Sequence, residues 1–524
     1  MRPPDRRQWC LLGLAGVVVA FVGLGSLYAT TVPKFLPADE TSHVGYALVV
    51  GHGDLPRLDT RVPDEIPGLA LQYEIRREIY TANHPPLFYL PTAVPLRAGV
   101  ASGHPVLGLQ LARLLSVAMT AVAGVAVWCT ARLLLPRRPP VAVLAAALTL
   151  LLPAVPRFAG VVYNDGFSMA VAAVAVLAGV RVLVLGPSPR RIAFAAVAAA
   201  ALTLTRAVGI PASILVVGTV AAAVLVHDSP PAGRRIARAV ATGVLVLAAA
   251  ALSSAWFWLR SRHLYGDLTG SDYNLARFGY GPRGSTAELL SDPHWVVTLA
   301  RQLWGRVYDT AEYAVGLWTL PGLVVVGLGA VGAVRLAVDA ARHRSGSLAA
   351  TWRSWAPAKR GRALAWPVLA AWVGLLYVST VSYIASGGGI HGRYLLPGLP
   401  AAALLAATAV AAVPPRRWGW APALTVSILV ATGLQWAARL ADQLQPDRSW
   451  WGAAMTRTAA DANGVPAVAV WGAVLLALAG GAVTVASVVA LSRDPGTPEN
   501  PDARGEPTAR GERQGTATPV VAAG

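Results

Sequence analysis

The residues best suited to chemistry form an acidic pair followed by a histidine, in the segment Phe35-Leu-Pro-Ala-Asp-Glu-Thr-Ser-His43. After the proline, the apolar spacing predicts a short amphipathic helix lying on a membrane surface. Asp39 and His43 are four residues apart, so both would lie on the same side of that helix. The positive end of the helix favours ionised Asp39 and Glu40. The pair could accept a proton or hold a divalent cation, and ordinary helix capping is the alternative.

Two further polar segments are Tyr80-Thr-Ala-Asn-His-Pro-Pro-Leu-Phe-Tyr89 and Val162-Tyr-Asn-Asp-Gly166. His84 precedes two prolines and is therefore expected to be extended. Asp165, next to Asn164, lies beside an apolar run, where an ionisable group is costly enough to suggest a function. Each segment also has a simpler interpretation, as an interfacial turn with an incidental histidine and as an Asn-Asp-Gly turn.

Two arginines, Arg206 and Arg393, lie at ends of apolar runs where the general charge pattern predicts none; Arg393 precedes Tyr394 in a segment that starts with Gly387-Gly-Gly. Planar guanidinium groups bind phosphate through paired hydrogen bonds. The alternative is that both side chains reach lipid headgroups. Arg113 is a third such arginine and could equally be structural.

These residues must be positioned by membrane helices. The chain has 524 residues, of which 55% are apolar and 13% charged, and this excludes a soluble globular enzyme. Crossing a bilayer takes about 20 residues per helix. The apolar runs predict an all-α polytopic membrane protein of about twelve spans, at 9–32, 106–135, 141–158, 165–186, 192–205, 208–227, 239–259, 313–338, 363–385, 394–413, 417–438 and 465–491.

The net charge of +18 indicates topology and not nucleic-acid binding, because the arginines are scattered through short loops. With the N-terminus cytoplasmic, every short inner connection is basic. The prediction is a multi-pass plasma-membrane protein with both termini cytoplasmic, and the arginine bias suggests a GC-rich genome such as an actinobacterial one. Two long connections, 33–105 and 260–312, are acidic and would be extracytoplasmic. The proline-rich stretch 85–100 is assigned to that outer surface.

Several other classes of site find no support. Both cysteines, Cys10 and Cys129, lie in apolar segments, so no disulfide framework is expected. Nucleotide-binding, metalloprotease and zinc motifs are not found. The last segment, 492–524, is rich in Pro, Gly, Thr, Arg and Glu and is expected to be a disordered cytoplasmic tail.

Taken together, these segments resemble the GT-C superfamily of polytopic glycosyltransferases, which includes the protein O-mannosyltransferases and the transferases that add aminoarabinose to lipid A. The resemblance spans most of 9–491, and 1–491 is expected to be one GT-C-like transmembrane domain. Its motifs are short, so the specificity lies in their order and in their placement on one face. They are Asp39-Glu40, His84-Pro-Pro-Leu-Phe-Tyr89, Asn164-Asp165, Arg206 and Gly392-Arg-Tyr-Leu-Leu-Pro397.

The resemblance implies a sugar donor linked to polyprenyl phosphate and an acceptor on a glycan, lipid or protein at the outer face of the membrane. Asp39, with Glu40 beside it, would be catalytic or would hold a divalent cation. The substrate-binding residues would be His43, His84, Asn164, Asp165, Arg206, Arg393 and Tyr394. In two departures from the family, His84 stands where the aminoarabinose transferases have Lys, and Arg206 stands where many relatives have Lys.

Two other function classes remain open from the sequence. A twelve-span secondary transporter would match the number of spans, but such transporters usually show internal repeats and bind at the bilayer midplane. A non-catalytic membrane scaffold would leave Asp39 and Glu40 dispensable. The polar candidates at span ends and in long outer loops favour surface chemistry.

Overall fold

The structure is a computed structural model that describes residues 4–36, 38–69, 77–228, 231–304, 320–342, 352, 354–415, 418–448 and 450–493. The described residues are helical and contain no strand, only an isolated bridge between Arg61 and Glu78. The long helices are α1 (Arg6–Thr31), α4 (Pro105–Leu134), α7 (Asn164–Leu185), α9 (Gly209–His227), α10 (Ala232–Tyr265), α14 (Leu320–Arg342), α16 (Pro357–Ala385), α18 (Trp420–Leu444) and α20 (Ala467–Arg493).

Shorter helices connect or extend them. They are α2 (Ala38–Gly51), η2 (Tyr80–Asn83), α3 (Tyr89–Ala101), α5 (Pro139–Leu150), α6 (Ala154–Ala159), α8 (Pro189–Thr203), α11 (Ser271–Arg277), α12 (Thr286–Ser291), α13 (Pro293–Trp304), η4 (Gly392–Gly398), α17 (Leu399–Val410) and α19 (Trp451–Asn463). The helix α17 continues directly from η4, and the two together form one apolar segment, Gly392–Val410.

Within the described part of the chain, 10 helices are long and apolar enough to cross a membrane, judged by length and composition. The all-α polytopic class is therefore confirmed. The other two of the twelve expected spans form helices that are too short to be counted among these ten. The run 141–158 divides into α5 and α6 because Pro153 and Pro156 interrupt it, and a proline has no N–H for the helical hydrogen bond. The run 192–205 is α8, a helix of 15 residues.

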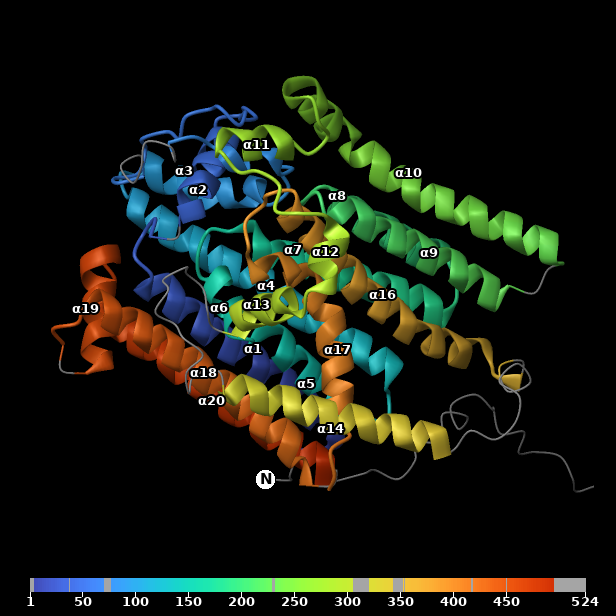
Figure 1. The fold of residues 1–524 in the computed structure, drawn as a ribbon. Helices are drawn as coiled ribbons and strands as arrows, with labels where there is room; N and C mark the ends of the chain where they lie inside the picture. The colour runs from blue at the N-terminus through green and yellow to red at the C-terminus, as the bar shows by residue number, and fades with distance from the viewer. Residues whose placement is uncertain are drawn as a thin grey trace, which may run out of the picture.

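The core lies among the central helices, and two long helices lie at the periphery. Figure 1 shows α10 and α14 along the outside of the bundle, whereas most residues of α5 and α7 are buried. Only 6% of the most apolar 18-residue stretch of α14 is buried inside the protein. The helices α1 and α20 approach each other closely at glycines: a Cβ atom on Gly23 would lie 2.4 Å from the backbone nitrogen of Ala477.

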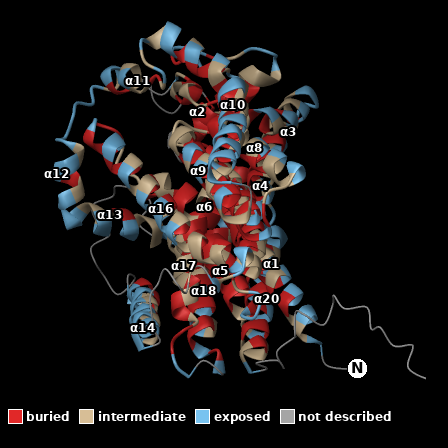
Figure 2. Cartoon of the chain, turned by 90° about the vertical axis from the view of Figure 1, so that its right-hand side faces the viewer, coloured by how far each residue is buried: buried red, intermediate tan, exposed pale blue. Residues whose placement is uncertain are grey.

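Three helices of the two long connections, α2, α3 and α11, lie at one end of the bundle in both ribbon views (Figures 1 and 2), whereas α12 and α13 lie nearer its middle. The helix predicted after Pro37 is present as α2, but it does not lie on a surface: residues 40–48 are all buried. The stretch 85–100 contains α3, a helix of 13 residues that is too short for a span.

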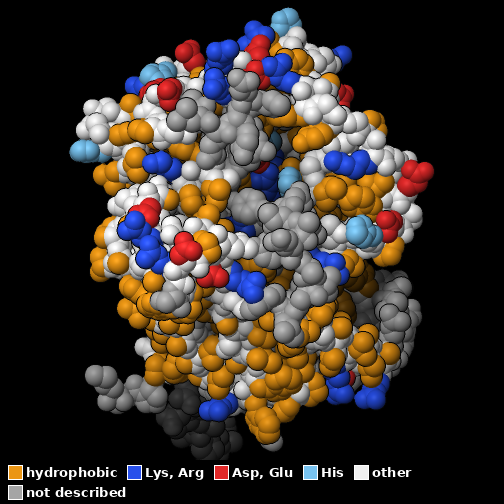
Figure 3. Space-filling view, turned by 60° about the vertical axis from the view of Figure 1, so that its left-hand side comes forward, with side chains coloured by type: hydrophobic (Ala, Val, Ile, Leu, Met, Phe, Trp, Pro, Cys, Tyr) orange, Lys and Arg blue, Asp and Glu red, His pale blue; other side chains and the backbone are white. Residues whose placement is uncertain are grey.

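Figure 3 shows that hydrophobic side chains gather over the lower part of one face, with Lys and Arg below them and mixed charges above them. This distribution is typical of a protein that spans a membrane. The expected tail, 492–524, lies outside the described residues apart from Ser492 and Arg493, which end α20.

Candidate functional site

Asp39 lies in the first turn of α2 and is held from three sides. The Tyr80 hydroxyl donates to Oδ1 at 2.7 Å, the Arg393 guanidinium donates to Oδ2, and the Asp39 backbone N–H donates to the Tyr163 hydroxyl at 3.1 Å. Burial by itself would raise the pKa of Asp39, but the charge of Arg393 and the two side-chain hydrogen bonds outweigh it and hold that pKa far below its ordinary value. Asp39 is therefore an ionised carboxylate.

A second carboxylate and a second guanidinium continue this arrangement. Arg206 forms an ion pair with Asp165 Oδ1, and Arg393 reaches to 4.0 Å from Asp165 Oδ2. The order in space is Asp39, Arg393, Asp165, Arg206, so charges of opposite sign alternate. The four residues come from α2, η4, α7 and the connection between α8 and α9. Segments separated by up to 354 positions along the chain thus form one cluster.

Aromatic rings enclose the two guanidinium groups. The Arg393 guanidinium carbon lies 5.0 Å from the Tyr163 ring centroid, 5.6 Å from that of Phe158 and 5.6 Å from that of Tyr394. The Arg206 guanidinium carbon lies 5.5 Å from the Tyr394 ring. These are cation–π distances. Tyr394 therefore contacts both arginines, and this contact restricts the orientation of each guanidinium plane.

The two predicted histidines lie beside the charged cluster. Their rings are stacked, with centroids 6.3 Å apart, and His43 Nδ1 lies 2.8 Å from the Tyr89 hydroxyl. Burial lowers the pKa of His43 to about 3, against the opposing effect of the Asp39 and Asp165 carboxylates. His84 has the extended backbone expected before a proline, with φ −93° and ψ 139°.

Several buried polar atoms in the cluster have no hydrogen-bond partner among the described residues. They are both amide atoms of Asn164, which is 1% exposed, Nε of Arg393 and Nδ1 of His84. Buried polar groups in native proteins are normally paired, so a group of unpaired ones calls for an explanation. The side chains of Asn164 and Arg393 contribute N–H donors among these atoms. The arrangement is suited to a ligand that is anionic or rich in hydroxyl groups.

Glu40 faces away from this cluster, in contrast to the catalytic role predicted for it. Both its oxygens are engaged: Arg113 donates to them at 2.8 and 2.6 Å, and the N–H groups of Phe35 and Val162 each donate at 3.0 Å. Both side chains are fully buried. Arg113 also binds the carbonyls of Ala29 and Val32 at the end of α1. The pair therefore joins α1, α2 and α4, which favours a structural role for Glu40; its catalytic role stays a prediction.

The residues present do not fit the divalent cation considered from the sequence. Among the described residues no group of three His, Cys, Asp or Glu side chains could hold a metal ion. Glu40 is occupied by Arg113, and a cation beside Asp39 or Asp165 would face Arg393 and Arg206.

The second long connection supports the site through its helices α11 and α13. Asn274 of α11 donates to the Tyr80 carbonyl at 2.9 Å, and Tyr80 in turn binds Asp39. Gln302 of α13 donates to the Ile390 carbonyl at 2.9 Å and accepts from the N–H of Gly392, the residue before Arg393. One connection therefore braces both members of the Asp39–Arg393 pair.

The structure brings eight of the nine predicted site residues together, at or beside one cluster, and separates Glu40 from it. Sequence reasoning missed Tyr80, Tyr163 and Phe158 as parts of the site. Tyr80 and Tyr163 lie inside the polar segments already singled out, so their positions were available as a signal. Phe158 lies in an apolar run and had no signal. Figure 3 shows basic side chains and a histidine inside a hollow in the upper part of one face.

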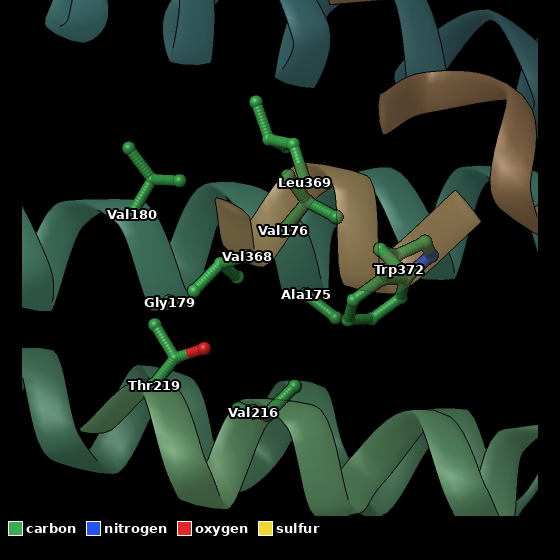
Figure 4. A pocket seen from close by; sticks show the side chains of 9 residues that line it. All are labelled: Ala175, Val176, Gly179, Val180, Val216, Thr219, Val368, Leu369 and Trp372. Carbon is green, nitrogen blue, oxygen red and sulfur yellow. The ribbon is translucent and has the colours of Figure 1, made fainter. Parts of the chain in front are cut away.

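A separate apolar crevice lies between α7, α9 and α16. It is lined by Ala175, Val176, Gly179, Val180, Val216, Thr219, Val368, Leu369 and Trp372 (Figure 4). Trp372 donates its indole N–H to the Pro397 carbonyl at 3.0 Å. The crevice contains no charged side chain, so it has none of the chemistry of the cluster.

No family model and no curated protein matches the chain. Among solved structures it is similar to ArnT from Cupriavidus metallidurans bound to undecaprenyl phosphate, with 17% identity, a TM-score of 0.48, and coverage of 92% of this chain and 77% of that one. It is also similar to the oligosaccharyltransferase AglB from Archaeoglobus fulgidus in complex with an inhibitory peptide and a dolichol-phosphate, with 13% identity, a TM-score of 0.41, and coverage of 92% and 56%.

Proposed function

We propose that this chain is a membrane glycosyltransferase that moves a sugar from a polyprenyl-phosphate donor to an acceptor hydroxyl on the extracytoplasmic face. The observation that carries the proposal is the Asp39–Arg393–Asp165–Arg206 cluster, with unpaired polar atoms around it. It combines a base for an acceptor with cations for a phosphate. A nucleotide is not required by this chemistry.

The phosphate side of the site consists of Arg206, Arg393 and His84. In the proposed reaction, the bond between the anomeric carbon and the phosphate oxygen breaks, and negative charge develops on the departing phosphate. Preorganised cations and N–H donors at the place where charge develops lower the barrier. The rings of Tyr163 and Tyr394 hold the guanidiniums before the substrate arrives, so little reorganisation is needed.

The acceptor side is Asp39. Among the three carboxylates described above it is the most exposed, at 24% of its side chain, so an acceptor can reach it. Asp39 orients the hydroxyl as the new bond to the anomeric carbon forms, and it receives the hydroxyl proton. Its low pKa makes it a weak base, so the proton moves late, when the attacking oxygen has become acidic. Asn164, with its unpaired amide, is placed to bind a sugar hydroxyl.

The test is the variant Asp39→Asn in purified full-length protein reconstituted into lipid. Undecaprenyl- and dolichyl-phosphate-linked sugars are the donors to try first, with release of the lipid phosphate as the measurement. We expect transfer to fall about 10²- to 10⁴-fold, the usual contribution of a general base. The matched control is Asp54→Asn, an exposed acid of the same connection, which should retain transfer.

Unchanged transfer in Asp39→Asn would contradict the assignment of the base. A wild-type protein that carries a solute into vesicles and transfers no sugar would instead support the secondary transporter.

A further inference from the structure

We propose that His84 is a conditional cation of the site: it is neutral in the free protein and takes up a proton when the donor phosphate binds. This inference rests on the proposed function, because it assigns His84 to the phosphate side. It adds that donor binding is coupled to a proton, which fixed arginines cannot provide.

The ring of His84 is held in place and has one nitrogen unused. The His84 backbone is fixed at both ends, since its N–H donates to the Thr81 carbonyl at 3.0 Å and its carbonyl accepts from the Tyr46 hydroxyl at 2.8 Å. The ring stacks against His43. Nδ1 is buried and has no hydrogen-bond partner in the part of the chain that the structure describes. A ligand acceptor at Nδ1 would complete the site if that nitrogen carried a hydrogen.

The charges around the ring favour the neutral form before the ligand binds. The nearby titratable groups are Arg206, His43, Asp39 and Arg393, which come from α2, η4 and the connection between α8 and α9. Burial, and then the positive charge of Arg206, hold the pKa of His84 well below its ordinary value; Asp39 opposes them only in part. Free His84 is therefore uncharged at neutral pH.

The charge balance explains why His84 would take up a proton when the ligand binds. Arg206 and Arg393 are balanced by Asp39 and Asp165, so the free cluster has no net charge. A donor phosphodiester adds one negative charge to this buried place. A proton on His84 restores neutrality, and the new negative charge itself favours that proton. After transfer the lipid phosphate is a monoester with a further ionisable oxygen, so the same proton also stabilises the product.

The sign of the pH dependence follows from this linkage. Binding raises the pKa of His84, so affinity is constant below the free-state value. Between the free-state and bound-state values it falls as pH rises, by up to about tenfold per pH unit for one proton, and above the bound-state value it is level again. A charged residue of fixed protonation at this position would show no such slope.

The experiment measures affinity against pH for the purified full-length protein in detergent, with methyl farnesyl phosphate as the probe. This phosphodiester carries one negative charge across the range, so any proton taken up belongs to the protein. Calorimetry in two buffers of different ionisation enthalpy counts that proton directly. The variants are His84→Lys, His84→Gln and, as the matched control, His104→Gln, which changes an exposed histidine of the same connection.

We expect wild type and His104→Gln to show the slope and the proton uptake. We expect His84→Lys to bind with no slope at and below neutral pH, and His84→Gln to bind more weakly with no slope. A pH-independent wild type, or a slope that survives in His84→Lys, would overturn the inference while leaving the phosphate site intact. A wild type that binds no phosphodiester at any pH would contradict the proposed function itself. Circular dichroism confirms folding of each variant.

Discussion

At the scale of single residues, exposure separates the roles of three neighbouring carboxylates. The side chain of Asp39 is 24% exposed, that of Asp165 is 2% exposed and that of Glu40 is fully buried. Only a carboxylate that an acceptor can reach can act as its base. Asp165 instead fixes the two arginines between which it lies. Glu40 and Asp39 are adjacent in sequence, yet α2 turns them towards different surroundings, because successive helical side chains lie about 100° apart.

The buried Glu40–Arg113 pair leads to a prediction about stability. We expect Glu40→Ala to destabilise the protein by about 3–5 kcal/mol, because it leaves the Arg113 charge buried and unpaired. Asp39→Asn should change stability much less. The measurement is thermal unfolding in detergent. The double variant Glu40→Gln/Arg113→Met should recover much of the loss. A Glu40→Ala protein of normal stability that had lost sugar transfer would restore the catalytic role expected from the sequence.

At the scale of elements, the site depends on helices that do not themselves carry the charged residues. The helix α11 reaches Asp39 through Asn274 and Tyr80, and α13 reaches Arg393 through Gln302. The contact at Gly392 is so close that a Cβ atom there would lie 2.5 Å from the Leu299 carbonyl. A small residue is therefore required where α13 crosses η4.

This bracing predicts a defect in turnover from a residue outside the site. We expect Gln302→Ala to lower kcat by about tenfold or more, since small displacements of reacting groups are costly. The matched control on the same helix is Thr298→Ala, because Thr298 contacts only the exposed His294 by a side-chain hydrogen bond among the described residues. Transfer kinetics in reconstituted membranes provide the measurement. Conservative Gln302→Glu should retain part of kcat; equal rates in the Gln302→Ala and Thr298→Ala proteins would refute the bracing role.

At the scale of the whole molecule, the site lies at the end of the bundle where α2, α3 and α11 gather (Figures 1 and 2). The basic short connections predict that this end is extracytoplasmic. A polyprenyl-linked donor brings its sugar to a membrane surface, so a site at the end of the spans suits it better than one at the midplane.

The orientation can be tested by labelling. Cys10 and Cys129 would first be replaced. Single cysteines would then be introduced at Ser102, at the end of the bundle that holds the site, and at Arg137, in a short basic connection. Intact cells would be treated with a membrane-impermeant maleimide. We expect labelling at Ser102 alone, and labelling at Arg137 only after the membrane is opened. The reverse pattern would place the site on the cytoplasmic side and exclude the proposed extracytoplasmic reaction.

The sequence by itself determined the membrane class, the positions of most spans and the residue types of the site. These are local properties: hydrophobic length defines a span, and a charge beside an apolar run is conspicuous without any partner. His84 could also be assigned its extended backbone, because the next residue is a proline.

Only the tertiary structure decided which charges meet. Arg113 pairs with Glu40, which lies 73 positions away in the sequence, and Arg393 pairs with Asp39, which lies 354 positions away. Such choices depend on how helices distant in sequence pack, which no local pattern encodes. The same packing buries α2 instead of leaving it on a surface, and it places the rings of Tyr163 and Phe158 over a guanidinium. The sequence therefore indicated which polar side chains belong to the cluster, and the tertiary structure decided which of them pair with one another.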